Sequence, residues 1–182
     1  MKRSEINQIL QSAQAFFDEF QFKLPPWAAW SEADWTARAA DCAEIFDCQL
    51  GWDITDFGSG DFAKRGLTLF TVRNGKLGSS KKVYAEKIMV VGDGQETPAH
   101  FHFHKAEDII NRGGGKLILQ LWNSDGAGGK ATTPVVASID GIPRTVEAGG
   151  YVSLTPGESI CLTQGLYHRF FGEGRVLVGE VS

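Results

Sequence analysis

The sequence is poor in the residues that mark several common classes of protein. Its 182 residues include only three cysteines, Cys42, Cys48 and Cys161, an odd number without a CxxC pair. This excludes a disulfide framework and a zinc ribbon as the basis of the fold. No apolar run approaches the roughly 18 residues of a membrane-spanning helix. Polar residues also interrupt the N-terminal segment, so no signal peptide is visible and we expect a cytoplasmic protein.

An excess of positive charge is also missing. Eighteen Lys and Arg residues stand against 22 Asp and Glu residues, which gives a net charge of −4 and a pI of about 5.6. Proteins that bind nucleic acid through its phosphates need a basic surface, so we expect no nucleic-acid partner. Hydrophobic residues make up 42% and charged residues 22%, as in ordinary globular proteins. The length then indicates a single structural domain.

Residues 1–60 carry a helical pattern, which predicts an N-terminal helical extension packed on the remainder. Apolar residues recur there at spacings of three and four: Ile6, Ile9, Leu10, Ala13, Phe16, Phe17 and Phe20. This is the stripe of an amphipathic helix, for which Ser4 is a candidate cap. Pro25 and Pro26 end that helix or separate it from the next.

A second helix is expected to begin at Ser31, with Asp34 at the third position of a capping box. Its apolar stripe consists of Trp35, Ala39, Cys42, Ala43 and Phe46, and Gly51 ends the region. Since amphipathic helices bury such faces, both stripes are interpreted as packing surfaces. The sequence therefore predicts a pair of α-helices at the N-terminus.

The helical period disappears in residues 61–182, where short stretches rich in Val, Ile, Leu and aromatic residues predict β-strands. Eight such stretches are residues 67–72, 83–91, 116–122, 135–139, 151–154, 159–162, 168–171 and 176–181. Turn dipeptides such as Asn74-Gly75 and Asp140-Gly141 separate them. Many short strands at this spacing favour a sandwich or barrel over a parallel sheet.

Histidine is scarce as well, and its distribution is uneven. Three of the four histidines, His100, His102 and His104, fall within five residues, and His168 lies in another predicted strand. Side chains alternate along a strand, so His100 and His102 would project from one face and converge on a single ion. A carboxylate a few residues later, such as Glu107, could supply a third ligand, and a histidine from a neighbouring strand would complete the set.

Imidazole and carboxylate ligands suit borderline divalent ions such as manganese, iron, cobalt, nickel or zinc. Four protein ligands without a thiolate leave positions for water or substrate oxygens, as in a catalytic metal site. His104 shares the parity of the pair but lies farther along the strand. We interpret it as a group beside the ligands, a substrate contact or an exposed residue rather than as a ligand.

Two stretches of the sequence resemble the metal-binding motifs of the cupin superfamily. The first motif is matched by Gly94, His100-x-His102, Glu107 and Gly113, and the second by Gly150, Pro156-Gly157 and His168. In the second stretch, the distance from proline to histidine is longer than usual. The resemblance implies a mainly β fold, the cupin-type double-stranded β-helix or jelly-roll barrel, which agrees with the predicted strands.

A narrower resemblance runs from about residue 84 to the end of the sequence, and the N-terminal helices are similar to those of longer members. The matching segments are Glu86-Lys87-Ile88, Thr97-Pro98-Ala99-His100-Phe101-His102, Glu107 to Gly115, Leu121-Trp122-Asn123, Pro156 to Ile160, Gly165 to Phe170 and Val178 to Val181. Together they resemble the D-lyxose isomerase family of cupins. Of these, the run Glu-Asp-Ile-Ile-Asn-Arg-Gly-Gly-Gly is the most specific.

The resemblance implies an enzyme that interconverts D-lyxose with D-xylulose, and D-mannose with D-fructose, through an enediol intermediate. It implies that a metal, usually Mn²⁺, is held by His100, His102, Glu107 and His168. Co²⁺, Fe²⁺, Ni²⁺ and Zn²⁺ are alternative ions. It also implies acid–base and substrate-orienting roles for Lys87, Lys105 and Glu180. Family members are expected to carry an acidic tail after the last strand, whereas this sequence ends at Ser182.

The residues themselves leave simpler roles open. Glu180 shares the parity of apolar residues in its strand, which favours a catalytic base, but it could also face water at a rim. Lys87 could polarise a sugar hydroxyl or extend from the barrel mouth to water, and Lys105 could lie in the cavity or in an exposed loop. Trp122, Tyr167 and Phe170 could either contact the substrate as apolar walls of its site or pack in the core. The glycine run 113–115 is interpreted as a sharp turn.

Two other function classes fit the same four ligands. Three histidines and a glutamate also resemble the site of iron-dependent cupin dioxygenases, and a non-catalytic sugar- or metal-binding cupin would need no base. The extended family resemblance favours the isomerase. Phenylalanine-rich helices and sheet edges that need cover indicate a homodimer, and a monosaccharide is the expected ligand.

Overall fold

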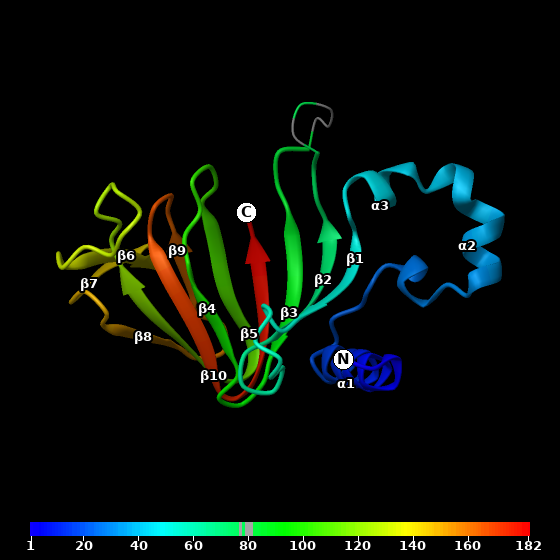
Figure 1. Ribbon diagram of the computed structural model, residues 1–182, viewed down its shortest axis with the longest axis horizontal. Coiled ribbons are helices and arrows are strands. Elements are labelled where there is room, and N and C mark those ends of the chain that lie inside the picture. Colours follow the sequence, from blue (N-terminus) through cyan, green and yellow to red (C-terminus); the bar gives the residue numbers. More distant parts are fainter. Residues whose placement is uncertain (77, 79–81) are drawn as a thin grey trace.

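A computed structural model describes residues 1–76, 78 and 82–182, with helices followed by a β-rich body (Figure 1). The helical elements are α1 (Arg3–Glu19), η1 (Pro26–Ala29), α2 (Glu32–Arg38), η2 (Ala39–Asp41) and α3 (Ala43–Asp47). The strands are β1 (Gly51–Thr55), β2 (Leu67–Arg73), β3 (Glu86–Val91), β4 (Glu96–His100), β5 (Glu107–Trp122), β6 (Val135–Ile139), β7 (Ile142–Val146), β8 (Tyr151–Leu154), β9 (Ser159–Leu162) and β10 (Tyr167–Val181). The predicted mainly β fold with N-terminal helices is confirmed.

The named strands pair antiparallel, and two long strands are shared between two facing sheets. In one sheet, the C-terminal arm of β10 pairs with β3 and with the N-terminal arm of β5, and β9, β6 and β7 continue the order. In the other, the N-terminal arm of β10 lies between β4 and the C-terminal arm of β5, which also pairs with β8. Figure 1 shows β10 descending in orange and returning in red. The sequence pattern predicts two separate strands here, residues 168–171 and 176–181.

The glycine run predicted as a sharp turn lies inside β5, at the bend where the strand passes between the sheets. The pairing of β5 with β10 shifts register between Glu173 and Val176, opposite these glycines. Gly114 has a φ of +89°, and a Cβ atom there would lie 2.3 Å from the carbonyl oxygen of Arg175. The run therefore forms a β-bulge and not a turn. A bulge bends the strand but lets it continue, whereas a turn would end it.

Asn111 ties this bulge to the second sheet. Its fully buried side-chain amide donates to the carbonyls of Gly115 and Leu154 at 2.9 and 2.8 Å. Its side-chain oxygen accepts from the backbone N–H of Gly113 at 3.0 Å. The specific Asn-Arg-Gly-Gly-Gly segment of the sequence is thus a structural device that fixes the bend.

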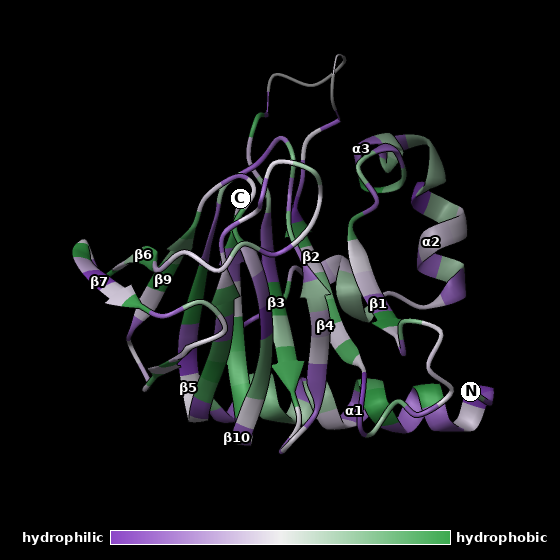
Figure 2. Ribbon diagram, turned by 60° about the vertical axis from the view of Figure 1, so that its left-hand side comes forward, coloured by the Kyte–Doolittle hydropathy of each residue, from purple (hydrophilic) through white to green (hydrophobic). Residues whose placement is uncertain are grey.

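Alternation along the strands divides the apolar residues between two cores. On β3, Met89 and Val91 belong to the core inside the barrel, whereas Ile88 and Val90 belong to a second core on the outer face. Hydrophobic and hydrophilic bands accordingly alternate along the strands in Figure 2. Because side chains alternate along a strand, Lys87, two residues before Met89, lies on the same inward face.

Helix α1 covers the outer face of the sheet that contains β2 and β3. Ala13, Phe16 and Phe17 of the predicted stripe are buried there, and the Phe17 ring stacks on Trp52 with centroids 5.5 Å apart. A Cβ atom on Gly113 would lie 2.3 Å from the ring of Phe20, so this glycine also lets the helix approach the sheet. The predicted packing role of the stripe is confirmed. Ser4 lies inside α1, and the N-cap is Lys2.

The predicted second helix is broken into α2, η2 and α3, which corrects the expectation of one helical pair. Its start is as expected, because the backbone N–H of Asp34 donates to the Ser31 hydroxyl at 3.3 Å. The apolar stripe is only partly covered, and Phe46 is 61% exposed. In Figure 1 this segment lies at the end of the molecule away from β7. A stripe that buries so little apolar surface does not hold one continuous helix.

The predicted helical extension, residues 1–60, also contains a strand. Residues Gly51–Thr55 form β1, which pairs with β2 from Gly51 opposite Thr71 to Thr55 opposite Leu67. Trp52 lies on this strand, and its ring packs against the rings of Phe17 and Phe70. Among the described residues, no helix has the length and apolar character needed to cross a membrane.

We predict that Asn111→Ala destabilises the protein by about 2–4 kcal/mol, because it leaves two buried backbone groups and one partly buried carbonyl without their side-chain partner. The measurement is urea unfolding followed by circular dichroism. Asn7→Ala on the exposed face of α1 is the control, with an expected change within about 0.5 kcal/mol. Equal midpoints for the two variants would contradict the role of Asn111 in holding the bulge.

Candidate metal centre and active-site cavity

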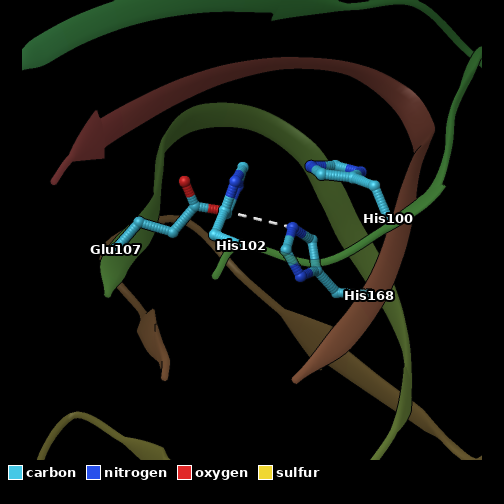
Figure 3. A group of neighbouring side chains, drawn as sticks. All are labelled: His100, His102, Glu107 and His168. Atoms are coloured by element: carbon cyan, nitrogen blue, oxygen red, sulfur yellow. Dashed lines mark ion pairs between the residues drawn. The ribbon is translucent and has the colours of Figure 1, made fainter. Parts of the chain in front are cut away.

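Four side chains that are separated in the sequence meet at one end of the barrel. One ligand atom from each of His100, His102, Glu107 and His168 lies within 4.8 Å of the others (Figure 3). His100 ends β4, Glu107 begins β5, and His168 lies near the start of β10. This group could hold a metal ion, and it contains the same four residues that the sequence analysis selected.

Strand pairing explains most of this convergence. His100 is the direct partner of His168 in the antiparallel pair of β4 and β10, with ring centroids 4.3 Å apart. His102, in contrast, lies in the loop after β4, so the expected strand alternation of His100 and His102 is wrong. The loop is held where the His102 carbonyl accepts from the backbone N–H of Gly165 at 3.0 Å.

The intervening phenylalanines help to hold the same loop. The ring of Phe101 packs against Phe103 and against Tyr167, with both pairs of centroids 4.6 Å apart. The loop therefore presents His102 to the cluster while its aromatic residues contact one another and β10.

Backbone carbonyls orient two of the imidazole rings. The Nδ1 atom of His100 lies 2.8 Å from the Pro98 carbonyl, and that of His168 lies 3.0 Å from the Leu166 carbonyl. A carbonyl only accepts, so each Nδ1 carries the proton and each Nε2 keeps its lone pair, the usual outer support of a metal-binding histidine.

The Nε2 atom of His168 is buried without a hydrogen-bond partner in the described part of the chain. It lies 3.1 Å from Oε1 of Glu107, and the Nε2 atom of His102 lies 3.3 Å from the same oxygen. A nitrogen lone pair and a carboxylate oxygen at this separation repel each other unless a cation lies between the two atoms. The donor set of imidazole nitrogens and a carboxylate therefore fits a divalent metal ion.

Electrostatics keep these donors in the protonation states that ligation needs. Burial lowers the pKa values of His100 and His102, which favours neutral rings. Burial favours protonation of Glu107, but its hydrogen bond and ion pair with Lys105 hold the pKa of that carboxyl well below its usual range. Glu107 is therefore ionised at neutral pH.

A cavity of about 260 Å³ adjoins the cluster and separates into a charged side and an apolar side. The charged side contains Lys87, Lys105, Glu107 and Glu180 together with His100 and His102. The other lining residues are Phe57, Leu67, Leu69, Met89, Thr97, Pro98, Ile109 and Phe170. Such a cavity can hold a small polar molecule against the candidate metal ligands.

Glu180 lies at the centre of an ionic network on the charged side. It is opposite Lys87 in the pairing of β10 with β3, and its Oε1 accepts from Lys87 Nζ at 2.7 Å. Lys105 Nζ donates to the same oxygen at 2.8 Å and to Oε2 of Glu107 at 2.6 Å. Lys105 therefore links the carboxylate of the candidate metal cluster to Glu180.

The network keeps Glu180 charged although its side chain is only 8% exposed. Burial acts to raise the pKa of this carboxyl, but the positive charges of Lys87 and Lys105 outweigh burial and the neighbouring Glu107, so the pKa lies below its usual value. Burial lowers the pKa of Lys105, but Glu180 and Glu107 outweigh it and raise that pKa overall. Glu180 and Lys105 are thus both ionised near neutral pH.

The structure separates the other candidate residues. Phe170 is buried and lines the cavity. Trp122 lines a different hollow, where Lys130 Nζ lies 3.5 Å from its ring centroid, and the Tyr167 hydroxyl donates to the Gly128 carbonyl. His104 is exposed and is not among the described residues that line the cavity.

Apart from Phe170, the apolar side of the cavity was not predicted from the sequence, and neither was one polar contact. Met89 and Ile109 could have been found from strand parity, because each lies two residues from an inward charged residue of its strand. Thr97 and Phe57 carry no comparable signal. Ser182, whose hydroxyl donates to Glu180 Oε1 at 3.1 Å, was also missed.

Comparisons with known proteins agree with the site. The sequence model of the D-lyxose isomerase family matches residues 1–182. A relative from Serratia proteamaculans named D-lyxose/D-mannose isomerase is 54% identical over 188 residues, which cover 100% of this chain and 82% of the relative. A protein of the same name from Escherichia coli O157:H7 is 52% identical, with 100% and 83% covered.

Solved structures show the same fold at much lower identity. The L-ribose isomerase of Acinetobacter sp. DL28, in complex with L-ribose, has a TM-score of 0.62 and 13% identity, covering 100% of this chain and 80% of that chain. The ligand-free L-ribose isomerase of Cellulomonas parahominis has a TM-score of 0.60 and 14% identity, covering 100% and 83%. The two facing sheets and these similarities confirm the predicted cupin barrel. The family match over the whole chain, together with relatives that are more than half identical, shows that this protein belongs to the D-lyxose isomerase family.

Proposed function

We propose that this sugar isomerase interconverts D-lyxose with D-xylulose, and D-mannose with D-fructose, in a metal-dependent reaction. The observation that carries the proposal is the position of an ionised, buried carboxylate, Glu180, in the same cavity as the candidate metal ligands. The names of the relatives at 52–54% identity support the choice of sugars. Family membership also favours isomerisation over a dioxygenase or a non-catalytic binding role.

The proposed metal is Mn²⁺, held by His100, His102, Glu107 and His168. When bound, a divalent cation supplies a Lewis acid that polarises the sugar carbonyl and stabilises negative charge on its oxygen. The protein residues orient this donor set through the Pro98 and Leu166 carbonyls and keep Glu107 ionised. Water is excluded on the apolar side of the cavity by residues such as Met89 and Phe170.

Glu180 is the proposed base that moves a proton between the first two carbons of the open-chain sugar. Its Oε1 atom accepts the hydrogen bonds from Lys87, Lys105 and Ser182. Its Oε2 atom has no hydrogen bond within the described residues, so Oε2 is the atom that takes the proton from C2 and returns it to C1. Lys87 and Lys105 hold the carboxylate in place and balance the negative charge that develops on the substrate.

A cytoplasmic location and a homodimer stay predictions. The exposed apolar residues of the α2–α3 segment, such as Phe46, support self-association. Sedimentation equilibrium of the purified protein distinguishes a dimer from a monomer.

Glu180→Gln is expected to reduce kcat by about 100-fold to 10,000-fold, because the amide retains the shape of the side chain but cannot accept the proton. The assay is ketose formation from D-lyxose, with exchange of the C2 hydrogen in D₂O followed by NMR. Glu173→Gln, an exposed position on the same strand, is the matched control and should keep full activity. Retention of more than a tenth of kcat in Glu180→Gln would remove this residue as the base.

Dialysis against EDTA should abolish activity, and Mn²⁺ should restore it. The melting temperature supplies a readout besides turnover, because an ion at 100 times its Kd stabilises the folded state by about 2.7 kcal/mol. His168→Ala should lose the Mn²⁺-induced rise in melting temperature, whereas His104→Ala, outside the cluster, should retain it. The reverse pattern would refute the proposed ligand set.

Lys87→Met should shift the acidic limb of the pH profile of kcat/KM to higher pH. Loss of the adjacent positive charge raises the pKa of Glu180, so the basic form disappears at a higher pH on acidification. Lys116→Met, on the exposed side of β5, provides the control profile. An unchanged acidic limb in Lys87→Met would show that another group controls it.

A further inference from the structure

The cavity contains one polar side chain whose presence neither the metal cluster nor the ionic network explains. Thr97 is 3% exposed and lines the cavity. Its Oγ1 atom is buried without a hydrogen-bond partner among the described residues. The other buried side-chain atom in this condition is Nε2 of His168, which a metal ion would satisfy. Buried hydroxyls are normally paired, so the Thr97 hydroxyl indicates a missing partner.

Strand register places Thr97 deeper in the barrel than the metal ligands. On β4, Thr97 is paired with Phe170, whereas His100 is paired with His168. The two pairs are two residues apart on β10, roughly 7 Å, because a register shift takes up the additional residue of β4. From His168, β10 runs through Phe170 toward its bend at Glu173. Thr97 therefore lies on the floor side of the cavity, and the ligands lie at the opposite end.

The surroundings of Thr97 make its hydroxyl the distinctive feature of that floor. The lining residues on the apolar side include Leu67, Met89, Ile109 and Phe170. Among the described lining residues, Thr97 is the only one with an uncharged polar side chain besides the histidines of the metal cluster. Its β-branched side chain restricts rotation about χ1, so the direction of the hydroxyl is held by the strand.

We propose that the Thr97 hydroxyl hydrogen-bonds a hydroxyl group of the open-chain sugar, at the end remote from the reacting carbons. This inference rests on the proposed isomerase function and adds a positioning residue to it. A sugar whose first two carbons lie at the metal ligands carries further hydroxyls along its chain. One of these reaches the floor and satisfies Oγ1, whereas an apolar substituent at that place would leave it unpaired. Thr97 thereby fixes the depth of the sugar and discriminates among substrates by the hydroxyl that they present.

The test compares Thr97→Val, which keeps the shape and removes the hydroxyl, with Thr97→Ser, which keeps the hydroxyl. The control is Thr68→Val, because Thr68 is equally buried at 3% but lies beneath α1 with Ala13 and Val90. For each Mn²⁺-loaded protein, KM and kcat are measured for D-lyxose and D-mannose. Calorimetry measures the affinity for D-arabitol, a polyol that presents the same hydroxyl chain without a carbonyl.

Thr97→Val is expected to weaken D-arabitol binding and to lower kcat/KM by about 10-fold to 100-fold, through KM more than kcat. Thr97→Ser should stay within about 3-fold of the parent, and Thr68→Val should match the parent. The melting temperature of Thr97→Val should not fall, because no protein hydrogen bond is lost. A merely structural threonine would change the melting temperature and leave KM and polyol affinity unchanged.

If Thr97→Val keeps the affinity of the parent protein for D-arabitol and its KM, the inference is overturned. The hydrogen-bond partner of the Thr97 hydroxyl is then an ordered water. If the parent protein converts none of the sugars, the isomerase proposal fails separately, and the D-arabitol comparison still decides the role of Thr97. A parent protein that binds neither the sugars nor D-arabitol overturns the assignment of Thr97 as well.

Discussion

The site depends on two strands that are each shared by two facing sheets. His168 lies on the arm of β10 that pairs with β4, and Glu180 lies on the arm that pairs with β3. The bend between the arms brings a candidate metal ligand and the proposed base to the same end of the barrel. Glu107 reaches this end on the first arm of β5. The bulge held by Asn111 therefore controls the distance between groups that never touch it.

Charge balance explains how the cavity keeps so many ionised side chains out of water. Lys87 and Lys105 offset Glu180 and Glu107 through contacts of 2.6–2.8 Å. Each buried carboxylate therefore has at least one ammonium partner, which buried charges require. A divalent ion added to this neutral set would make the cavity positive, which suits a substrate that becomes negatively charged as the reaction proceeds.

The chemistry of the site could be predicted from the sequence more fully than its architecture. The four candidate ligands were identifiable because histidines that are scarce elsewhere, clustered just before Glu107, are typical of a metal site. Strand parity correctly suggested an inward Glu180. His102 was predicted as a ligand because it was expected to lie on the same strand face as His100. The strand ends at His100, so the residue is in the cluster but the expected local structure is wrong.

Other features depend on contacts that no local pattern encodes. The glycines after Arg112 look like a turn, and only the pairing of β5 with β10 shows that they are a bulge within a strand. The apolar stripe of residues 35–46 resembles that of α1, but most of it is not buried and the helix breaks. No role could be predicted for Thr97, because a single threonine in a strand is ordinary until its missing hydrogen-bond partner is seen.

The period of two along β10 also limits how this chain can change in length. One extra residue between His168 and Phe170 would turn one of them out of the barrel, and the error would continue to the bend. The turn at Asp140 and Gly141 joins β6 and β7, which lie at one end of the strand order. A change in length there would not shift the register of β5 or β10. Insertions and deletions are therefore expected to accumulate in hairpin tips such as this one, while the two shared strands diverge by substitution alone.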